Sequence, residues 1–350
     1  MTRGFGGGLG SERAGPTGRK KMADKTRIAI LDDFQNVALE VADWSAVAER
    51  AEITVFNDHL ADPDAVAERL RDFDIVVIMR ERTPFPAALI DSLPNLRLLV
   101  TTGMRNLSVD LDAATARGVI VSGTGSVGYT PAELTWALIL ALMRNIPRED
   151  RATREGRWQT ALGRAINGRV LGVIGLGKIG ARVAAVGKAF EMDVIAWSQN
   201  LTGERCAEVG VRLAASFEEL LTTGDVITIH TVLSDRTRGL IGADELAKMK
   251  PTATLVNTSR GPVIEEAALI TALKDGTIAG AGLDVYDVEP LPLDHPLRNF
   301  ENTVITPHLG YVTDDNYRLY FGHAVEDIGA YLDGGPVRVL NPVVLEKTTA

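Results

Sequence analysis

Short apolar segments alternate with segments of helical periodicity along most of the 350-residue chain, and this alternation restricts the fold to few architectures. A helix between consecutive strands returns the chain to the end of the sheet at which the first strand began, so that the strands run parallel. Two successive series of strands are expected, at residues 27–31, 53–56, 74–79, 96–102 and 119–122, and then at 169–174, 193–197, 225–230, 253–258, 279–285 and 303–306. The sequence therefore predicts an α/β fold with two doubly wound parallel sheets.

Helix boundary signals agree with this pattern. Asp62 and Pro63 precede an amphipathic segment and are typical of the N-cap and the first position of a helix. A long helical segment at 130–158 is expected to break near Pro147. A final helix is expected near residues 316–332.

The segment "VIGLGKIG" joins an apolar strand to a helix and has the glycine spacing of a dinucleotide-binding turn. Gly175 suits the tight turn, Gly177 allows close approach of a pyrophosphate, and Gly180 permits close packing of helix on strand. Lys178 and Ile179 begin the helix, whose N-terminus attracts phosphate. These five residues are predicted to bind the cofactor.

The next strand ends at Ser198, where an NAD site usually carries an acidic residue that binds the ribose hydroxyls. Serine does not repel a 2′-phosphate, and it supplies no cation to bind one. We therefore predict NAD as the cofactor, with NADP tolerated. Arg205 is the candidate cation should NADP be preferred.

Polar side chains follow several strands of the second series. Arg260, Asp284, Glu289 and His308 all come shortly after expected strand ends, where ligands bind in open parallel sheets. A guanidinium binds a carboxylate through two hydrogen bonds, an imidazole exchanges a proton, and a carboxylate orients that imidazole. Beside a nicotinamide, this set predicts hydride transfer at a 2-hydroxy acid.

The segment 156–310 closely resembles the D-isomer-specific 2-hydroxyacid dehydrogenases, through "GRW", "LGVIGLGKIG", "LVNTSRGPVIEEAALITALKDGTIAGAGLDVYDVEP" and "NTVITPHLG". A looser resemblance extends over the first series of strands, in "MRERTPF" and "LDAATARGVIVSG". The resemblance implies a flavodoxin-like substrate domain and a Rossmann cofactor domain. It also implies oxidoreductase activity on a D-2-hydroxy or 2-keto acid.

Roles for individual residues follow from the same resemblance. Arg260 would bind the substrate carboxylate and carbonyl, and His308 would be the acid/base with Glu289 as its partner. Asp284 would hold the nicotinamide carboxamide, and Thr231 would line the cofactor cleft.

The resemblance further implies a substrate domain made from both chain ends, at 22–122 and 316–350, and a cofactor domain at 123–315 that forms a homodimer. The final helix would return to the substrate domain and set a hinge whose closure excludes water. Residues 1–21 are glycine-rich and charged, and are expected to be a disordered extension.

The substrate loop departs from the family pattern. The family usually carries a glycine-rich run with an Asp-Asn pair, whereas this chain has Gly103, Met104 and Arg105 in "TTGMRNLSVDL". Together with Arg80, these residues are candidates for substrate binding. Arg80, Arg82 and Arg105 either meet a phosphate or second carboxylate or are ordinary surface residues, and both readings stay open.

Composition excludes several other functions. A formal charge of −9 and a pI near 5.2 argue against a nucleic-acid or anionic-membrane surface. No run reaches the 18 or so apolar residues of a membrane span. The single cysteine, Cys206, suits a reducing cytoplasm, and no residue grouping suggests a metal site. Because the chain ends at Ala350, we expect no C-terminal regulatory domain like that of some phosphoglycerate dehydrogenases.

Alternatives remain at the level of function. Among enzymes, a glyoxylate or hydroxypyruvate reductase and a 3-phosphoglycerate dehydrogenase both fit the motifs. A formate dehydrogenase is disfavoured, because Glu289 stands where those enzymes have glutamine. In a different class, transcriptional corepressors that sense NAD resemble this family and retain the same residues.

Overall fold

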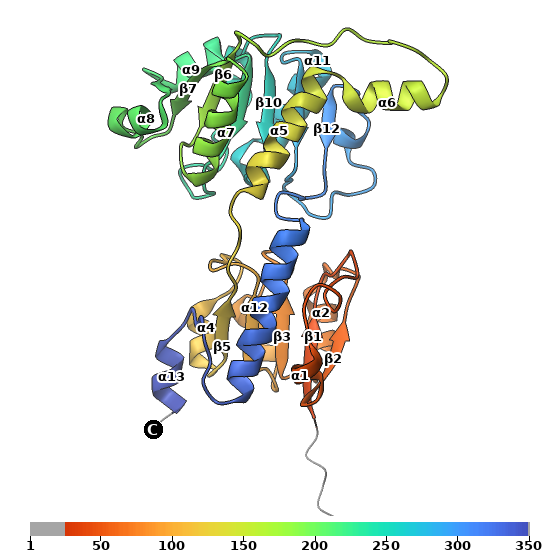
Figure 1. Cartoon of the computed structure of the whole chain (residues 1–350), viewed down its shortest axis with the longest axis vertical. Coiled ribbons are helices and arrows are strands. Elements are labelled where there is room, and N and C mark those ends of the chain that lie inside the picture. Colours follow the sequence, from red (N-terminus) through yellow and green to blue (C-terminus); the bar gives the residue numbers. More distant parts are fainter. Residues whose placement is uncertain (1–24, 349–350) are drawn as a thin grey trace, which may run out of the picture.

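The computed structural model describes residues 25–348 and consists of two α/β lobes (Figure 1). The lobe at the bottom of the view contains the first series of strands, and the lobe at the top contains the second. Two chain segments connect them, one before helix α5 (Thr130–Met143) and one before helix α12 (Asp314–Leu332). No helix in the described part of the chain is long and apolar enough to span a bilayer.

The first lobe is a five-stranded parallel sheet in the order β2-β1-β3-β4-β5. Its strands are β1 (Thr26–Ile30), β2 (Ala51–Val55), β3 (Ile75–Ile78), β4 (Leu98–Thr101) and β5 (Ile120–Gly123). Its helices are α1 (Ser45–Ala48), α2 (Pro63–Leu70), α3 (Ala87–Ser92), α4 (Leu111–Ala116), α12 and α13 (Val343–Thr348). Ile28 packs into the core under α12 and Ala29 into the core on the opposite face, so both faces of the sheet are buried.

The second lobe is a seven-stranded sheet in the order β12-β11-β10-β9-β6-β7-β8. Its strands are β6 (Val170–Ile174), β7 (Asp193–Trp197), β8 (Arg212–Leu213), β9 (Val226–Ile229), β10 (Thr254–Asn257), β11 (Gly280–Leu283) and β12 (Thr303–Ile305). The order reverses direction between β6 and β9, which is the position where doubly wound sheets bind ligands beyond their strand ends. Strand β8 was not predicted, because two exposed residues at a sheet edge carry no periodic pattern.

Five helices flank this sheet besides α5 and α6 (Ile146–Arg154): α7 (Lys178–Ala189), α8 (Gly203–Val209), α9 (Phe217–Thr223), α10 (Ala243–Lys248) and α11 (Glu266–Asp275). The predicted break in the long helix is confirmed. Helix α5 ends at Met143, and Asn145 adopts a left-handed φ of 53° before Pro147 starts the first turn of α6. The proline needs no amide hydrogen there.

The predicted start of helix α2 is also confirmed. Asp62 caps the helix by accepting a hydrogen bond from the Asp64 amide, and Pro63 is the first helical residue. Val66 and Leu70 are buried, as the periodicity requires.

The two crossing segments are tied to each other. The Gly125 amide donates to His323 Nδ1 at 3.0 Å, and the Val127 amide donates to Asn316 Oδ1, also at 3.0 Å. Both acceptors lie on α12, which packs on the first sheet through Tyr320 and other buried residues. The final helix therefore returns to the first lobe, as expected from the sequence.

Candidate active site

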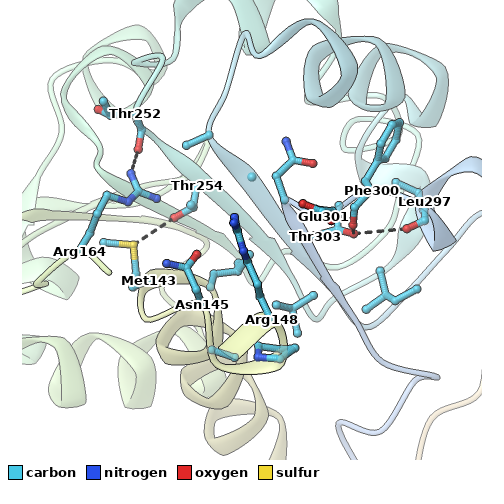
Figure 2. Close-up of a pocket in the computed structure, with 18 of the residues that line it drawn as sticks. Met143, Asn145, Arg148, Arg164, Thr252, Thr254, Leu297, Phe300, Glu301 and Thr303 are labelled. Carbon is cyan, nitrogen blue, oxygen red and sulfur yellow. Dashed lines mark hydrogen bonds between the residues drawn. The ribbon is translucent and has the colours of Figure 1, made fainter. Parts of the chain in front are cut away.

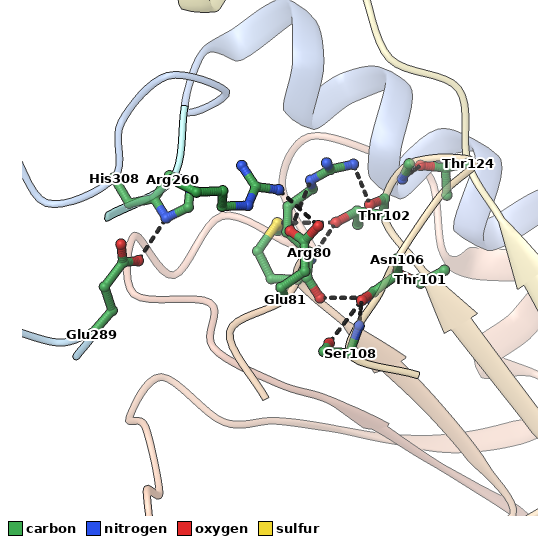
Figure 3. Close-up of polar contacts among 12 residues, drawn as sticks. Arg80, Glu81, Thr101, Thr102, Asn106, Ser108, Thr124, Arg260, Glu289 and His308 are labelled. Carbon is green, nitrogen blue, oxygen red and sulfur yellow. Dashed lines mark hydrogen bonds and ion pairs between the residues drawn. The ribbon is translucent and has the colours of Figure 1, made fainter. Parts of the chain in front are cut away.

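Residues from both lobes meet where the carboxyl ends of their strands face each other (Figure 3). Arg260 follows β10, Glu289 follows β11, and His308 follows β12. Arg80 and Glu81 follow β3 of the first sheet. Because parallel strands end at a common edge, residues far apart in sequence come together here.

His308 and Glu289 form a close pair. His308 Nδ1 lies 2.6 Å from Glu289 Oε2, and Glu289 Oε1 accepts a hydrogen bond of 2.9 Å from the Tyr286 amide. His308 has a left-handed φ of 55°, which is unusual for a residue with a side chain. The carboxylate is thus anchored to the backbone and orients the imidazole, leaving Nε2 for a reacting group.

Asp284 stabilises the segment that carries His308. Its carboxylate accepts hydrogen bonds from the Thr306 hydroxyl at 2.6 Å, the Leu309 amide at 2.6 Å and the Gly310 amide at 2.9 Å. Burial raises the pKa of Asp284 above its usual value, although these hydrogen bonds act in the opposite direction. The contact with the nicotinamide carboxamide that the resemblance implies for Asp284 stays a prediction, and the contacts present here hold the chain on both sides of His308.

Arg260 reaches across to the first lobe. Its Nη2 lies 2.8 Å from Glu81 Oε1, and its Nη1 donates to the Ser259 carbonyl at 2.7 Å. Burial tends to raise the pKa of Glu81, but the positive charges of Arg260 and Arg80 outweigh it and hold that pKa below its usual value. Sequence reasoning overlooked Glu81. The available signal was a carboxylate between two arginines directly after a buried strand.

The predicted substrate loop lies against Arg80. Arg80 Nη1 donates to the Thr102 carbonyl at 3.1 Å, and a Cβ on Gly103 would come within 1.8 Å of that nitrogen. A side chain here would displace the guanidinium, and the φ of 96° at Gly103 itself favours glycine. Met104 and Arg105 are both exposed on the same loop.

Arg82 makes different contacts from Arg80. Its guanidinium donates to the Asp32 carbonyl at 2.8 Å and stacks on the rings of Phe34 and Tyr311. Both interactions stabilise the loop after β3. Of the three arginines considered from the sequence, Arg82 is the one held by a backbone carbonyl and two aromatic rings.

The glycine turn after β6 has the geometry of a dinucleotide cradle. Gly175 has a φ of 95°, and a Cβ there would meet the His230 backbone at 2.9 Å. A Cβ on Gly180 would lie 2.0 Å from the Gly175 carbonyl oxygen, whereas one on Gly177 would face open space. Lys178 is exposed and Ile179 half-buried in the first turn of α7. The turn is therefore tightly packed at Gly175 and Gly180 and open at Gly177, where a pyrophosphate would bind.

Two more predicted cofactor residues border this turn. Thr231 follows β9, and its hydroxyl oxygen is buried without a hydrogen-bond partner among residues 25–348. Ser198 follows β7 and is half-buried. Arg205 donates from Nε to the carbonyl of Leu176, inside the glycine turn, at 3.3 Å. An orphaned hydroxyl and an open glycine turn fit a bound dinucleotide.

A pocket of about 670 Å³ lies at the amino ends of strands in the second sheet, opposite the candidate active site (Figure 2). Its lining includes Thr254, Gly280 and Thr303, which are the first residues of β10, β11 and β12. Met143 at the end of α5 and Arg148 in the first turn of α6 line one side. The length of the strands therefore separates the pocket from Arg260, Glu289 and His308, which follow the carboxyl ends.

Comparison with known proteins agrees with this geometry. The family model described as "D-isomer specific 2-hydroxyacid dehydrogenase, NAD binding domain" matches residues 136–310. A D-3-phosphoglycerate dehydrogenase of Archaeoglobus fulgidus is 40% identical over 266 residues, 75% of this chain and 50% of that protein. A glyoxylate reductase of Korarchaeum cryptofilum is 35% identical over 312 residues, 86% of this chain and 93% of that protein. The chain thus spans half the length of the first relative and nearly all of the second.

Solved structures share the whole architecture. The crystal structure of a phosphoglycerate oxidoreductase from Vibrio cholerae has a TM-score of 0.84 and 37% identity, covering 89% of this chain and 100% of that one. The family match includes the glycine turn, Arg260, Glu289 and His308. The chain therefore belongs to the D-isomer-specific 2-hydroxyacid dehydrogenases, a family of NAD-dependent oxidoreductases that act on CH–OH donors.

Proposed function

We propose that this protein transfers a hydride between a nicotinamide cofactor and a D-2-hydroxy or 2-keto acid. The observation that carries the proposal is the 2.6 Å His308–Glu289 pair, which lies with Arg260 at the carboxyl ends of neighbouring strands in the sheet that bears the glycine turn. A proton donor, a carboxylate-binding cation and a cofactor cradle are the parts that such a reaction requires.

Each catalytic group has one task. Arg260 binds the carboxylate and polarises the carbonyl of a 2-keto acid through its guanidinium N–H groups. His308 Nε2 donates a proton to the carbonyl oxygen during reduction and removes it during oxidation. The bound nicotinamide supplies or accepts the hydride at the neighbouring carbon.

Glu289 and Asp284 position His308. Glu289 accepts from Nδ1 and stabilises the imidazolium that proton removal from substrate creates. Asp284 secures the backbone on both sides of the histidine, through Thr306 and Leu309. Thr231 is proposed to line the cofactor cleft, where its unpaired hydroxyl supports a polar contact.

The proposed cofactor is NAD, with NADP tolerated. Gly175, Gly177 and Gly180, together with Lys178 and Ile179, would hold the pyrophosphate at the start of α7. Ser198 at the ribose end leaves the choice between the two cofactors weak.

Substrate binding is assigned to residues 22–122 and 316–350, including Arg80, Gly103, Met104 and Arg105, and cofactor binding to 123–315. Closure of the two lobes about the crossing segments would remove water from the site. A buried Cys206 is compatible with the proposed cytoplasmic location.

We also propose a homodimer formed by the cofactor lobe. Helix α6 and the chain after it extend away from the sheet (Figure 1), and they expose Trp158 at 78% and Leu162 at 96%. Leu162 also lines the pocket at the amino ends of the strands. Exposed aromatic and aliphatic side chains on an extended arm, next to a pocket, are typical of an interface.

The activity is tested by following NADH absorbance with the full chain and a panel of 2-keto acids. Saturable oxidation of NADH with at least one of them is expected. Cofactor binding without turnover on any 2-keto acid would instead favour the NAD-sensing corepressor.

A further inference from the structure

Glu81 lies between two guanidinium groups that come from different lobes (Figure 3). Its Oε1 is 2.8 Å from Nη2 of Arg260, and its Oε2 is 3.7 Å from Nε of Arg80. The side chain is only 22% exposed. Oε2 is buried and has no hydrogen-bond partner among residues 25–348. A carboxylate thus lies against the guanidinium that is proposed to bind the substrate carboxylate.

The loop that carries Glu81 is firmly held. Arg80 adopts a left-handed φ of 54°, and the Arg82 amide closes the turn on the Met79 carbonyl at 3.2 Å. The Arg80 amide donates to the Thr102 hydroxyl at 2.8 Å, and its carbonyl accepts from Asn106 Nδ2 at 2.7 Å. A left-handed arginine is unfavourable by itself, so these contacts are what keep the turn and direct Glu81 toward the second lobe.

Glu81 offsets part of the positive charge that Arg80 and Arg260 bring to the site. Arg80 and Arg260 are both positive, and Glu81 neutralises one of the two charges. Arg82 donates to the Asp32 carbonyl and lies over the Tyr311 ring, which in turn packs on the His308 ring. Arg260 uses N–H groups on Glu81 and Ser259 and retains others for a ligand. Among Arg80, Glu81 and Arg260 one positive charge remains, which matches a single carboxylate.

We propose that Glu81 is a specificity-determining residue that restricts the substrate to 2-hydroxy and 2-keto acids with one negative charge. This inference rests on the proposed function and names its substrate class. The carboxylate of the substrate binds Arg260, and a second anion directed toward Arg80 meets Glu81. Like charges at such short range in a partly desolvated site repel strongly.

The test compares two 2-keto acids that differ by one anionic group. Hydroxypyruvate and its phosphate ester form such a pair. We expect the wild type to prefer the singly charged acid in kcat/KM, and Glu81→Gln to reduce that preference by about tenfold or more, since the repulsive charge is gone. Glu81→Asp keeps the charge and is expected to retain the preference. Glu52→Gln, on the exposed side of β2, is the matched control.

The same ratio is measured as equilibrium binding of the two acids to the NAD-loaded protein by calorimetry. If neither acid is turned over, the panel of 2-keto acids decides the proposed function, whereas the binding ratio still reports on Glu81. An unchanged ratio in a folded Glu81→Gln variant overturns the inference. A wild type that prefers the phosphate ester and loses this preference in Arg105→Ala overturns it as well, because the exposed Arg105 would then bind the second anion.

Discussion

His308 Nδ1 lies 2.6 Å from Glu289 Oε2, and the backbone amide of Tyr286 binds the other oxygen of that carboxylate. The pair resembles His295 and Glu266, which are 3.0 Å apart. The difference is location. His308 follows a strand at the same end of the sheet as Arg260, whereas His295 caps a short helical turn through the Leu297 amide.

His308→Asn is expected to reduce kcat by about 10²–10⁴, because a positioned acid/base contributes that much to proton transfer. Binding of NADH should be unchanged, since the cofactor does not need the imidazole. Steady-state NADH oxidation and fluorescence titration measure the two quantities. His295→Asn, which breaks a similar pair elsewhere, should leave kcat within a few-fold. Equal losses in both variants would contradict the assignment.

Two glycines of the cofactor turn should respond differently to alanine. Gly180→Ala places a Cβ 2.0 Å from the Gly175 carbonyl, so the backbone must move, at a cost of about 1–3 kcal/mol. A fall in Tm of several degrees is expected. Gly177→Ala meets no atom within 4 Å and should leave Tm nearly unchanged, yet weaken NADH binding by intruding on the pyrophosphate. Thermal unfolding with and without NADH separates the two effects. A stable Gly180→Ala variant would show that the turn adjusts freely.

Ser198→Asp should move the cofactor preference toward NAD. A carboxylate accepts hydrogen bonds from the ribose hydroxyls and repels a 2′-phosphate, together worth about 1–3 kcal/mol. The measurement is kcat/KM for NADH and NADPH, with Ser198→Ala as the control that removes the hydroxyl without adding charge. A wild type already specific for NADPH would indicate that Arg205, 3.3 Å from the Leu176 carbonyl, binds the phosphate.

Stability should depend on pH through Asp327. Burial on α12 raises its pKa to about 7, although the charge and hydrogen bond of Arg338 act in the opposite direction. The folded protein therefore retains a proton that the unfolded chain, whose carboxyl has the ordinary pKa of 3.8, has lost. The stabilisation from this proton is complete below pH 3.8 and is lost as the pH rises through 7.

The asparagine of the Asp327→Asn variant cannot titrate, so the variant keeps its stability where the wild type loses it. The Tm of the variant minus that of the wild type should therefore increase between pH 5 and 8, by about 2–4 °C or more. Thermal unfolding at several pH values measures this difference. Asp333→Asn, an exposed residue just after the same helix, is the control and should show no such trend. A difference independent of pH would place the carboxyl of Asp327 in its ionised form throughout.

The proposed dimer is expected to depend on the arm after α6. Replacing Trp158 and Leu162 with serine removes apolar surface that is 78% and 96% exposed in the single chain, and should shift the protein toward monomer. Light scattering after gel filtration measures the mass. Leu39→Ser changes an exposed leucine of the first lobe and should leave the mass unchanged. A monomeric wild type would refute the interface.

Much of the fold was readable from local sequence. The strands, the cap at Asp62, the break before Pro147 and the glycine turn all depend on residues within a few positions of one another. Periodicity, capping and backbone freedom are local properties, so the sequence by itself determined them. The two exposed residues of β8 have no such pattern and were missed.

Only the tertiary structure decided how the lobes contribute to one site. Glu81 forms an ion pair with Arg260, which lies 179 positions later in the sequence. No local sequence pattern around either residue predicts this contact. The contacts of Arg82 with the rings of Phe34 and Tyr311 likewise join residues that are far apart in sequence. Charges act through space over a few ångströms, and which charges are neighbours is set by the packing of sheets and helices.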